Sequence, residues 1–116
     1  MPNPAVRALM FDVVRKGDHA TVHCYGRLIY GVGHLLYEEV QTLIPGSKHI
    51  TLDLTELAYV DSTGLGTLVR LYVSAKGAGC RFELVNLGKQ VRELLGLTNL
   101  LGVFGMIGEQ GVVVES

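Results

Sequence analysis

The order in which two kinds of hydrophobic pattern follow one another constrains the fold of this chain more than any other feature. Apolar and polar residues alternate in Ile50–Leu54 and again in Arg81–Val85, which is typical of half-buried strands. Between them, after Asp61-Ser62, one stripe at helical spacing predicts a long helix, formed by Leu65, Leu68, Val69, Tyr72, Val73 and Lys76. Two strands joined through a helix need a crossover connection, so we expect part of the sheet to be parallel.

The first part of the chain adds two strands and a helix. Ala20–Tyr25 alternates, with Ala20, Val22 and Cys24 on one face, and Met10–Val14 is its expected hairpin partner across a turn at Lys16-Gly17-Asp18. A helix is predicted over Gly31–Ile44, with Pro45-Gly46 as its stop and an apolar face made by Leu35, Leu36, Val40, Leu43 and Ile44.

The second part of the chain ends the long helix and adds a short one. Gly77-Ala78-Gly79 ends the long helix, because a glycine can take the left-handed position there. Gln90–Leu97 is predicted to be a short helix with Val91, Leu94 and Leu95 on one face, and Leu100–Ile107 a last short strand or helix. The prediction is a single α/β domain over residues 1–116, with a core at about residues 8–107 and a mixed, four- to five-stranded sheet flanked by helices.

Composition excludes several classes of protein. Of 116 residues 48% are hydrophobic and 18% are charged, which is too apolar for a disordered chain. A formal net charge of −1 lacks the basic excess of a nucleic-acid-binding domain, so we expect no direct nucleic-acid partner. Neither a signal peptide nor a stretch of about 18 apolar residues is present, so we expect no membrane insertion and a cytoplasmic location. Cys24 and Cys80 have no C-x-x-C spacing and are expected to be reduced thiols in or near the core.

The common motifs of catalysis and cofactor binding are absent from the sequence. His19 and His23 lie four residues apart but on a predicted strand, and neither His34 nor His49 completes a spacing of metal ligands. The chain has no P-loop, no complete dinucleotide fingerprint at Gly31-Val32-Gly33 and no G-x-S-x-G elbow. We therefore expect no intrinsic catalysis, no cofactor and no metal.

The segment from Ile50 to Gly66 carries the most functional information. The predicted strand is followed by a short loop and then by Asp61-Ser62-Thr63-Gly64, where Asp61 or Ser62 is expected to cap the helix. Capping does not require Gly64 and Gly66 in the first turns, where each glycine costs roughly 1 kcal/mol relative to alanine. Their presence indicates a close approach to the backbone, and a helix N-terminus favours a negatively charged phosphate.

This segment resembles the STAS (sulfate transporter and anti-sigma-factor antagonist) domain family, most closely its stand-alone bacterial antagonists. The family signature of a hydrophobic strand, a loop and D-S-[ST]-G-[LI]-G is matched by Asp61–Gly66 after Leu52-Asp53-Leu54. Val91–Leu100 is similar to the last helix of the family and the turn after it. The resemblance covers about residues 8–107 and implies a single STAS-like domain over the chain.

The resemblance implies a protein switched by phosphorylation. Ser62 would be the phosphoacceptor of an anti-sigma factor that is also a serine kinase, and a serine phosphatase would remove the phosphate. The unmodified protein would bind the anti-sigma factor and release a sigma factor. Asp61 would shape the loop or contact the kinase, Gly64 would permit its close approach, and Thr63 and Leu65 would complete this binding surface.

The chain departs from the family after the second strand. Antagonists usually carry glycine, an acidic residue, an aliphatic residue and aspartate there, whereas this chain has Gly26-Arg27-Leu28-Ile29. In the family this loop contacts the partner, so Arg27, Ile29 and Tyr30 are expected to form a more apolar partner surface; alternatively, Ile29 and Tyr30 pack beneath the first helix. The changed loop also favours an alternative function, a non-catalytic STAS scaffold subunit of a signalling complex or a lipid-transport ATPase. The remaining hypotheses are that the protein binds a small molecule or a nucleotide, or that it is an unrecognised enzyme.

Overall fold

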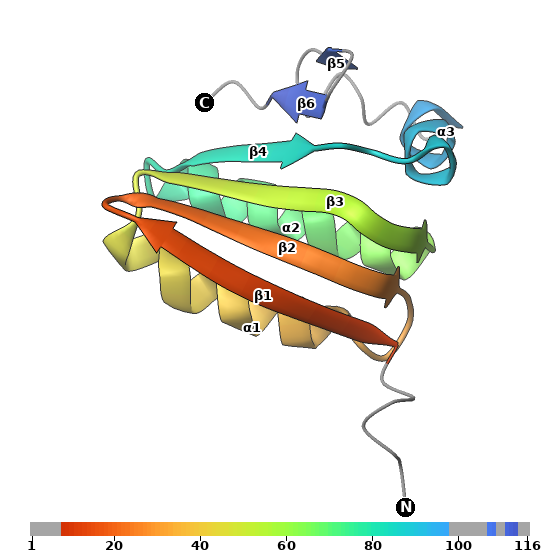
Figure 1. The fold of residues 1–116 in the computed structure, drawn as a ribbon, viewed down its shortest axis with the longest axis horizontal. Coiled ribbons are helices and arrows are strands. Elements are labelled where there is room, and N and C mark those ends of the chain that lie inside the picture. The colour runs from red at the N-terminus through yellow and green to blue at the C-terminus, as the bar shows by residue number, and fades with distance from the viewer. Residues whose placement is uncertain (1–7, 98–106, 109–110, 114–116) are drawn as a thin grey trace, which may run out of the picture.

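The computed structural model describes residues 8–97, 107–108 and 111–113 of the chain (Figure 1). Their elements, in chain order, are β1 (Leu9–Lys16), β2 (His19–Leu28), α1 (Gly33–Leu43), the 3-10 turn η2 (Ile44–Gly46), β3 (His49–Val60), α2 (Ser62–Gly77), β4 (Arg81–Val85), α3 (Lys89–Leu97), β5 (Ile107–Gly108) and β6 (Gly111–Val113).

The strands form one mixed sheet in the order β1-β2-β3-β4-β6-β5. β1 and β2 form the predicted antiparallel hairpin, and the crossovers through α1 and α2 make β2, β3 and β4 parallel. The predicted α/β fold is confirmed. The short strands β6 and β5 extend the four predicted strands to six by antiparallel pairing, while the predicted last element at Leu100–Ile107 lies outside the described residues except for Ile107.

Within the described residues, the helices leave one face of the sheet uncovered. In Figure 1, α1 and α2 lie side by side behind the sheet, and α3 lies beside the end of β4, in contact with β3. The core is formed where the inward side chains of the strands meet α1 and α2, and the alternation predicted for the strands is confirmed by the burial of Ala20, Val22, Cys24, Ile50, Leu52, Leu54, Phe82 and Leu84.

α2 buries a somewhat different stripe from the predicted one. Val73 is 61% exposed and Lys76 is exposed too, whereas Leu71 and Ala75 are buried. Leu68, Leu71, Tyr72 and Ala75 lie on the buried face of the helix. The predicted stripe has the same spacing of three and four residues, so only the packing against the sheet distinguishes the two faces.

β3 is longer than predicted. It continues to Val60, where the sequence indicated a strand ending near Leu54 and then a loop. Pairing with β2 is irregular at two places, opposite the β2 steps His23/Tyr25 and Gly26/Arg27, so β3 carries extra residues there. Such bulges break the alternation by which a strand is recognised in a sequence, and the buried residues of this part recur every third position, at Leu54, Leu57 and Val60.

Smaller predictions are also confirmed. Gly79 has a φ of +73° just after α2, and Val91 and Leu95 of α3 are buried. Cys24 and Cys80 are free and buried, and burial raises the pKa of Cys24 to about 12, which makes this thiol unreactive at neutral pH. None of the helices in the described ranges is long and apolar enough to cross a membrane.

Candidate functional site

The predicted site lies where β3 passes directly into α2. Asp61 is the N-cap of α2 in an extended conformation, with φ −94° and ψ −177°. Its Oδ1 accepts hydrogen bonds from the Gly64 N–H at 2.8 Å and the Thr63 hydroxyl at 2.7 Å. Of the two capping residues that the sequence allowed, the structure selects Asp61, which leaves Ser62 as the first residue of the helix.

Asp61 also joins this corner to the loop between β2 and α1. Its Oδ2 accepts a hydrogen bond from the Tyr30 N–H at 2.9 Å, and its own N–H donates to the Leu28 carbonyl at 3.2 Å. Desolvation alone would raise the pKa of this carboxyl, but the bonds from Gly64, Thr63 and Tyr30 outweigh it and hold the pKa below its usual value. Asp61 is therefore ionised at neutral pH.

The two hydroxyls after Asp61 differ in their hydrogen bonds. Ser62 and Thr63 are both exposed. The Thr63 hydroxyl donates to Asp61, whereas the Ser62 hydroxyl has no hydrogen-bond partner among the described residues. Ser62 thus presents an exposed hydroxyl at the N-terminus of a helix of 16 residues, where the helix dipole favours negative charge.

Gly64 and Leu65 face inward. Gly64 is buried, and a Cβ atom at this position would overlap the carbonyl group and side chain of Leu28. The close approach indicated by the sequence is therefore made by β2 of the same chain, not by an incoming partner. Leu65 is only 4% exposed and belongs to the core, whereas Gly66 is exposed and a Cβ there would meet nothing within 4 Å.

The loop that departs from the family pattern lies next to Ser62. Leu28 pairs with Val60 in the sheet, and the Tyr30 N–H donates to Asp61. Val60 and Asp61 are the two residues before Ser62, so the loop after β2 lies beside it. Arg27 is exposed and Ile29 is half-buried. Tyr30 is 82% exposed, so the alternative that it packs beneath α1 is wrong for this residue.

Gln90 is a residue of this corner that the sequence did not single out. Its side-chain oxygen accepts a hydrogen bond from the Val60 N–H, and its amide nitrogen donates to the Val60 carbonyl, both at 2.9 Å. These two bonds fix α3 to the last residue of β3. No sequence pattern could have found the contact, because a glutamine in the first turn of a short helix is ordinarily a solvated residue. Gln90 also lines an open hollow of about 410 Å³ with Lys89, Glu93 and Leu94.

Metal ligation has no support at this corner. The described ranges contain no group of three His, Cys, Asp or Glu residues placed to hold a metal ion. His19 and His23 lie on β2 and His49 on β3, while His34 is exposed on α1. What the corner offers chemically is a free hydroxyl, an ionised carboxylate beside it and an exposed loop.

Asp61→Ala is expected to lower the free energy of unfolding by about 1–2 kcal/mol, because it removes the cap of α2 and the acceptor of the Tyr30 N–H. Asp61→Asn is the matched control for the cap alone: its side-chain oxygen can still accept from Gly64 but its NH2 group cannot accept from the Tyr30 N–H, so its loss of stability should be smaller. Urea denaturation followed by circular dichroism measures both variants. Wild-type stability of Asp61→Ala would contradict the structural role given to this carboxylate.

Known proteins are similar to this chain in sequence and in fold. The family model described as STAS domain matches residues 10–110. The anti-sigma-B factor antagonist of Bacillus subtilis (strain 168) is 27% identical over 89 residues, which are 77% of this chain and 82% of the relative. The solved structure of a putative anti-sigma factor antagonist from Thermotoga maritima is 28% identical, with a TM-score of 0.71 over 78% of this chain and 79% of the other.

Two more distant solved structures share the fold. The anti-sigma factor antagonist SpoIIAA in its unphosphorylated form is 18% identical, with a TM-score of 0.69 over 78% of this chain and 82% of the other. The phosphorylated form of the Bacillus protein SpoIIAA is 17% identical, with a TM-score of 0.66 over 78% and 85%.

Proposed function

Because this chain belongs to the STAS domain family, we propose that it is an anti-sigma-factor antagonist that is switched off by phosphorylation of Ser62. The unphosphorylated protein binds an anti-sigma factor, which is also the serine kinase, and so releases a sigma factor. A serine phosphatase restores the binding form. The protein itself is not an enzyme in this proposal, uses no cofactor, does not contact nucleic acid directly and works in the cytoplasm.

The observation that carries the proposal is the free, exposed hydroxyl of Ser62 at the start of α2. A kinase needs an acceptor hydroxyl that it can reach, and the Thr63 hydroxyl next to it is already bonded to Asp61. This difference supports Ser62 over Thr63 as the acceptor. The relatives named as anti-sigma factor antagonists, one of them solved in a phosphorylated form, support the same general role.

The geometry also supports a switch that leaves the fold intact. A phosphate adds about −1.5 to −2 charges at pH 7. At the N-terminus of α2 such a charge is compatible with the helix dipole and stabilises it by about 0.3–1 kcal/mol. In a desolvated interface, next to the ionised Asp61, the same charge opposes binding.

Phosphate mapping tests the proposal. The protein is incubated with ATP and each anti-sigma serine kinase encoded in the same genome, and the phosphopeptides are sequenced by mass spectrometry. We expect one phosphate on Ser62, none in Ser62→Ala and an unchanged yield in Thr63→Val, which removes only the bonded hydroxyl. Phosphate on Thr63, or no phosphate with a cognate kinase that phosphorylates another substrate, would refute the switch.

The loop beside Ser62 supports a partner surface formed by Arg27, Ile29 and Tyr30. Arg27→Glu is expected to weaken binding to the anti-sigma factor about tenfold, about 1.4 kcal/mol, because it reverses a charge at the edge of the interface. The melting temperature should hardly change, since Arg27 is exposed. In contrast, Ile29→Asp should lower the melting temperature, because Ile29 is half-buried. Unaltered affinity of a folded Arg27→Glu, Tyr30→Ala double variant would exclude this surface.

The same loop favours the second candidate function, a non-catalytic scaffold subunit of a signalling complex or a lipid-transport ATPase. Antagonists usually carry acidic residues where this chain has Arg27 and Ile29. A scaffold subunit would co-purify in a stable assembly whose composition does not change when Ser62 is replaced by aspartate. An antagonist would leave its partner on the same substitution.

A further inference from the structure

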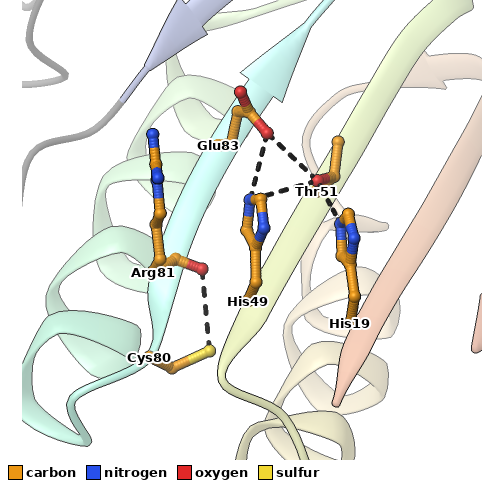
Figure 2. Close-up of polar contacts among 6 residues, drawn as sticks. All are labelled: His19, His49, Thr51, Cys80, Arg81 and Glu83. Atoms are coloured by element: carbon orange, nitrogen blue, oxygen red, sulfur yellow. Dashed lines mark hydrogen bonds and ion pairs between the residues drawn. The ribbon is translucent and has the colours of Figure 1, made fainter. Parts of the chain in front are cut away.

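The uncovered face of the sheet carries a cluster of two histidines, a threonine and a glutamate. His19, His49 and Glu83 come from the three parallel strands β2, β3 and β4, and Thr51 lies between them on β3 (Figure 2). The register explains the juxtaposition, because His19 pairs with His49 and Thr51 pairs with Glu83. The two imidazole rings are stacked, with centroids 4.1 Å apart and planes inclined by 5°.

One arrangement of protons satisfies the hydrogen bonds of the cluster. His49 Nε2 lies 3.0 Å from Glu83 Oε1, and a carboxylate only accepts, so this nitrogen carries a proton. The Thr51 hydroxyl donates to the same carboxylate oxygen at 3.2 Å. With its single proton used, Thr51 Oγ1 accepts from His19 Nε2, which lies 2.8 Å away. When each ring carries only this Nε2 proton it is neutral, and the lone pair of its Nδ1 atom can take one proton more.

We propose that His19 and His49 form one proton-binding site, which takes a single proton from solvent on a free Nδ1 atom as the pH falls below neutral and resists a second. The first proton neutralises the charge of Glu83, so the cluster passes from −1 to 0. The second would place two imidazolium rings 4.1 Å apart. Groups that interact this strongly titrate as a pair, in two separate steps.

The groups around the pair support this order of events. Burial lowers the pKa of His49, and the nearby His19 and Arg81 lower it further against the opposing effect of Glu83. On the other side, Lys16 of β1 pairs with His19 in the sheet and adds a second cation. Glu83 is therefore the carboxylate that balances one added proton, but not two.

His23 and Asp53 form a separate pair on this face. His23 Nδ1 lies 3.2 Å from Asp53 Oδ2, so Asp53 already has its own partner on the neighbouring strand. His19 borders an open hollow of about 410 Å³ with Val14, Lys16, Thr21 and His23, which gives water access to the ring. α1 and α2 cover the opposite face, so Lys16, Arg81 and Glu83 come from the strands, and Asp18 and Lys48 precede the two histidines in the chain.

Proton binding here is distinct from the proposed switch at Ser62. His49 is the first residue of β3, whereas Asp61 follows its last residue, so the two sites lie at opposite ends of a strand of 12 residues. Protonation of the histidine pair changes the charge of the uncovered face without involving the proposed phosphorylation site. Acidification would thereby alter what this face attracts or repels.

Histidine NMR tests the proposal on the intact chain. The ring Cε1–Hε1 signals are followed from pH 4.5 to 8.5, with His34 on α1 as an internal, solitary reference. We expect the signals of His19 and His49 to shift together in two steps separated by more than about one pH unit. Independent single steps of His19 and His49 in the folded wild-type protein would overturn the proposal without any variant.

Variants identify the partners in the pair. In His19→Gln, the remaining His49 should titrate in one step, at a higher pH than the second step of the wild type. Glu83→Gln should move the first step to lower pH, because it removes the negative charge that favours the first proton. Circular dichroism confirms that each variant is folded over the pH range. An unchanged His49 titration in folded His19→Gln would refute the shared site.

Discussion

Gly64→Ala is expected to lower the free energy of unfolding by about 3 kcal/mol, the largest effect of any single methyl group in this site. The added Cβ would overlap the Leu28 carbonyl, which is backbone of β2 and cannot rotate away. The start of α2 must then move away from β2, and the contact between Asp61 and the Tyr30 N–H moves with it. This loss exceeds the gain of roughly 1 kcal/mol that alanine normally gives over glycine in a helix.

Gly66→Ala is the matched control, two residues along the same helix. A Cβ at Gly66 meets nothing within 4 Å, so this variant should be as stable as the wild type or more stable by up to about 1 kcal/mol. Urea denaturation of the three proteins side by side measures both effects. Equal stabilities of the Gly64 and Gly66 variants would show that the approach of β2 to α2 is looser than described.

Ser62→Asp is expected to weaken binding to the anti-sigma factor about 100-fold, about 2.7 kcal/mol. The negative charge would enter the interface beside the ionised Asp61 and lose its hydration without gaining a partner. The variant should fold normally, because the side chain is exposed and lies at a helix N-terminus. Ser62→Ala should bind as tightly as the unmodified protein and should not respond to ATP.

The control for charge is Ser62→Asn, which has the shape of the aspartate variant without its charge. It should bind within a few-fold of the wild type in isothermal titration calorimetry. If Ser62→Asn lowered the affinity as much as Ser62→Asp, the loss of binding would be due to the size of the side chain and not to its charge. Equal affinity of the aspartate and alanine variants would exclude Ser62 as the switch.

The sequence was sufficient for the elements that have regular patterns. β2, the start of β3 and β4 alternate cleanly because one side of each strand faces α1 and α2, and the cap at Asp61 has a local signature. The continuation of β3 to Val60 could not be predicted, since the bulges opposite β2 remove the alternation.

Contacts between distant segments could not be predicted from the sequence for another reason. In the sequence, Gly64 is simply a glycine within a predicted helix, and only the tertiary structure shows that the Leu28 carbonyl approaches it. The bonds of Gln90 to Val60 join residues 30 positions apart, and the stacking of His19 on His49 depends on the register of two parallel strands. Spacing rules search for ligands along one element, so they do not find side chains brought together across a sheet.

The position of β1 at the end of the sheet has a consequence for how crowded chains behave. Along its outer side, backbone N–H and C=O groups face away from β2, and such an edge can pair with the edge of another chain and seed aggregation. Met10 and Val14 are 54% and 46% exposed there, which adds to that hazard. The exposed charges of Asp12, Arg15 and Lys16 interrupt the apolar run. A second chain that docked on β1 would have to dehydrate them, so these charges favour the separate, folded molecule.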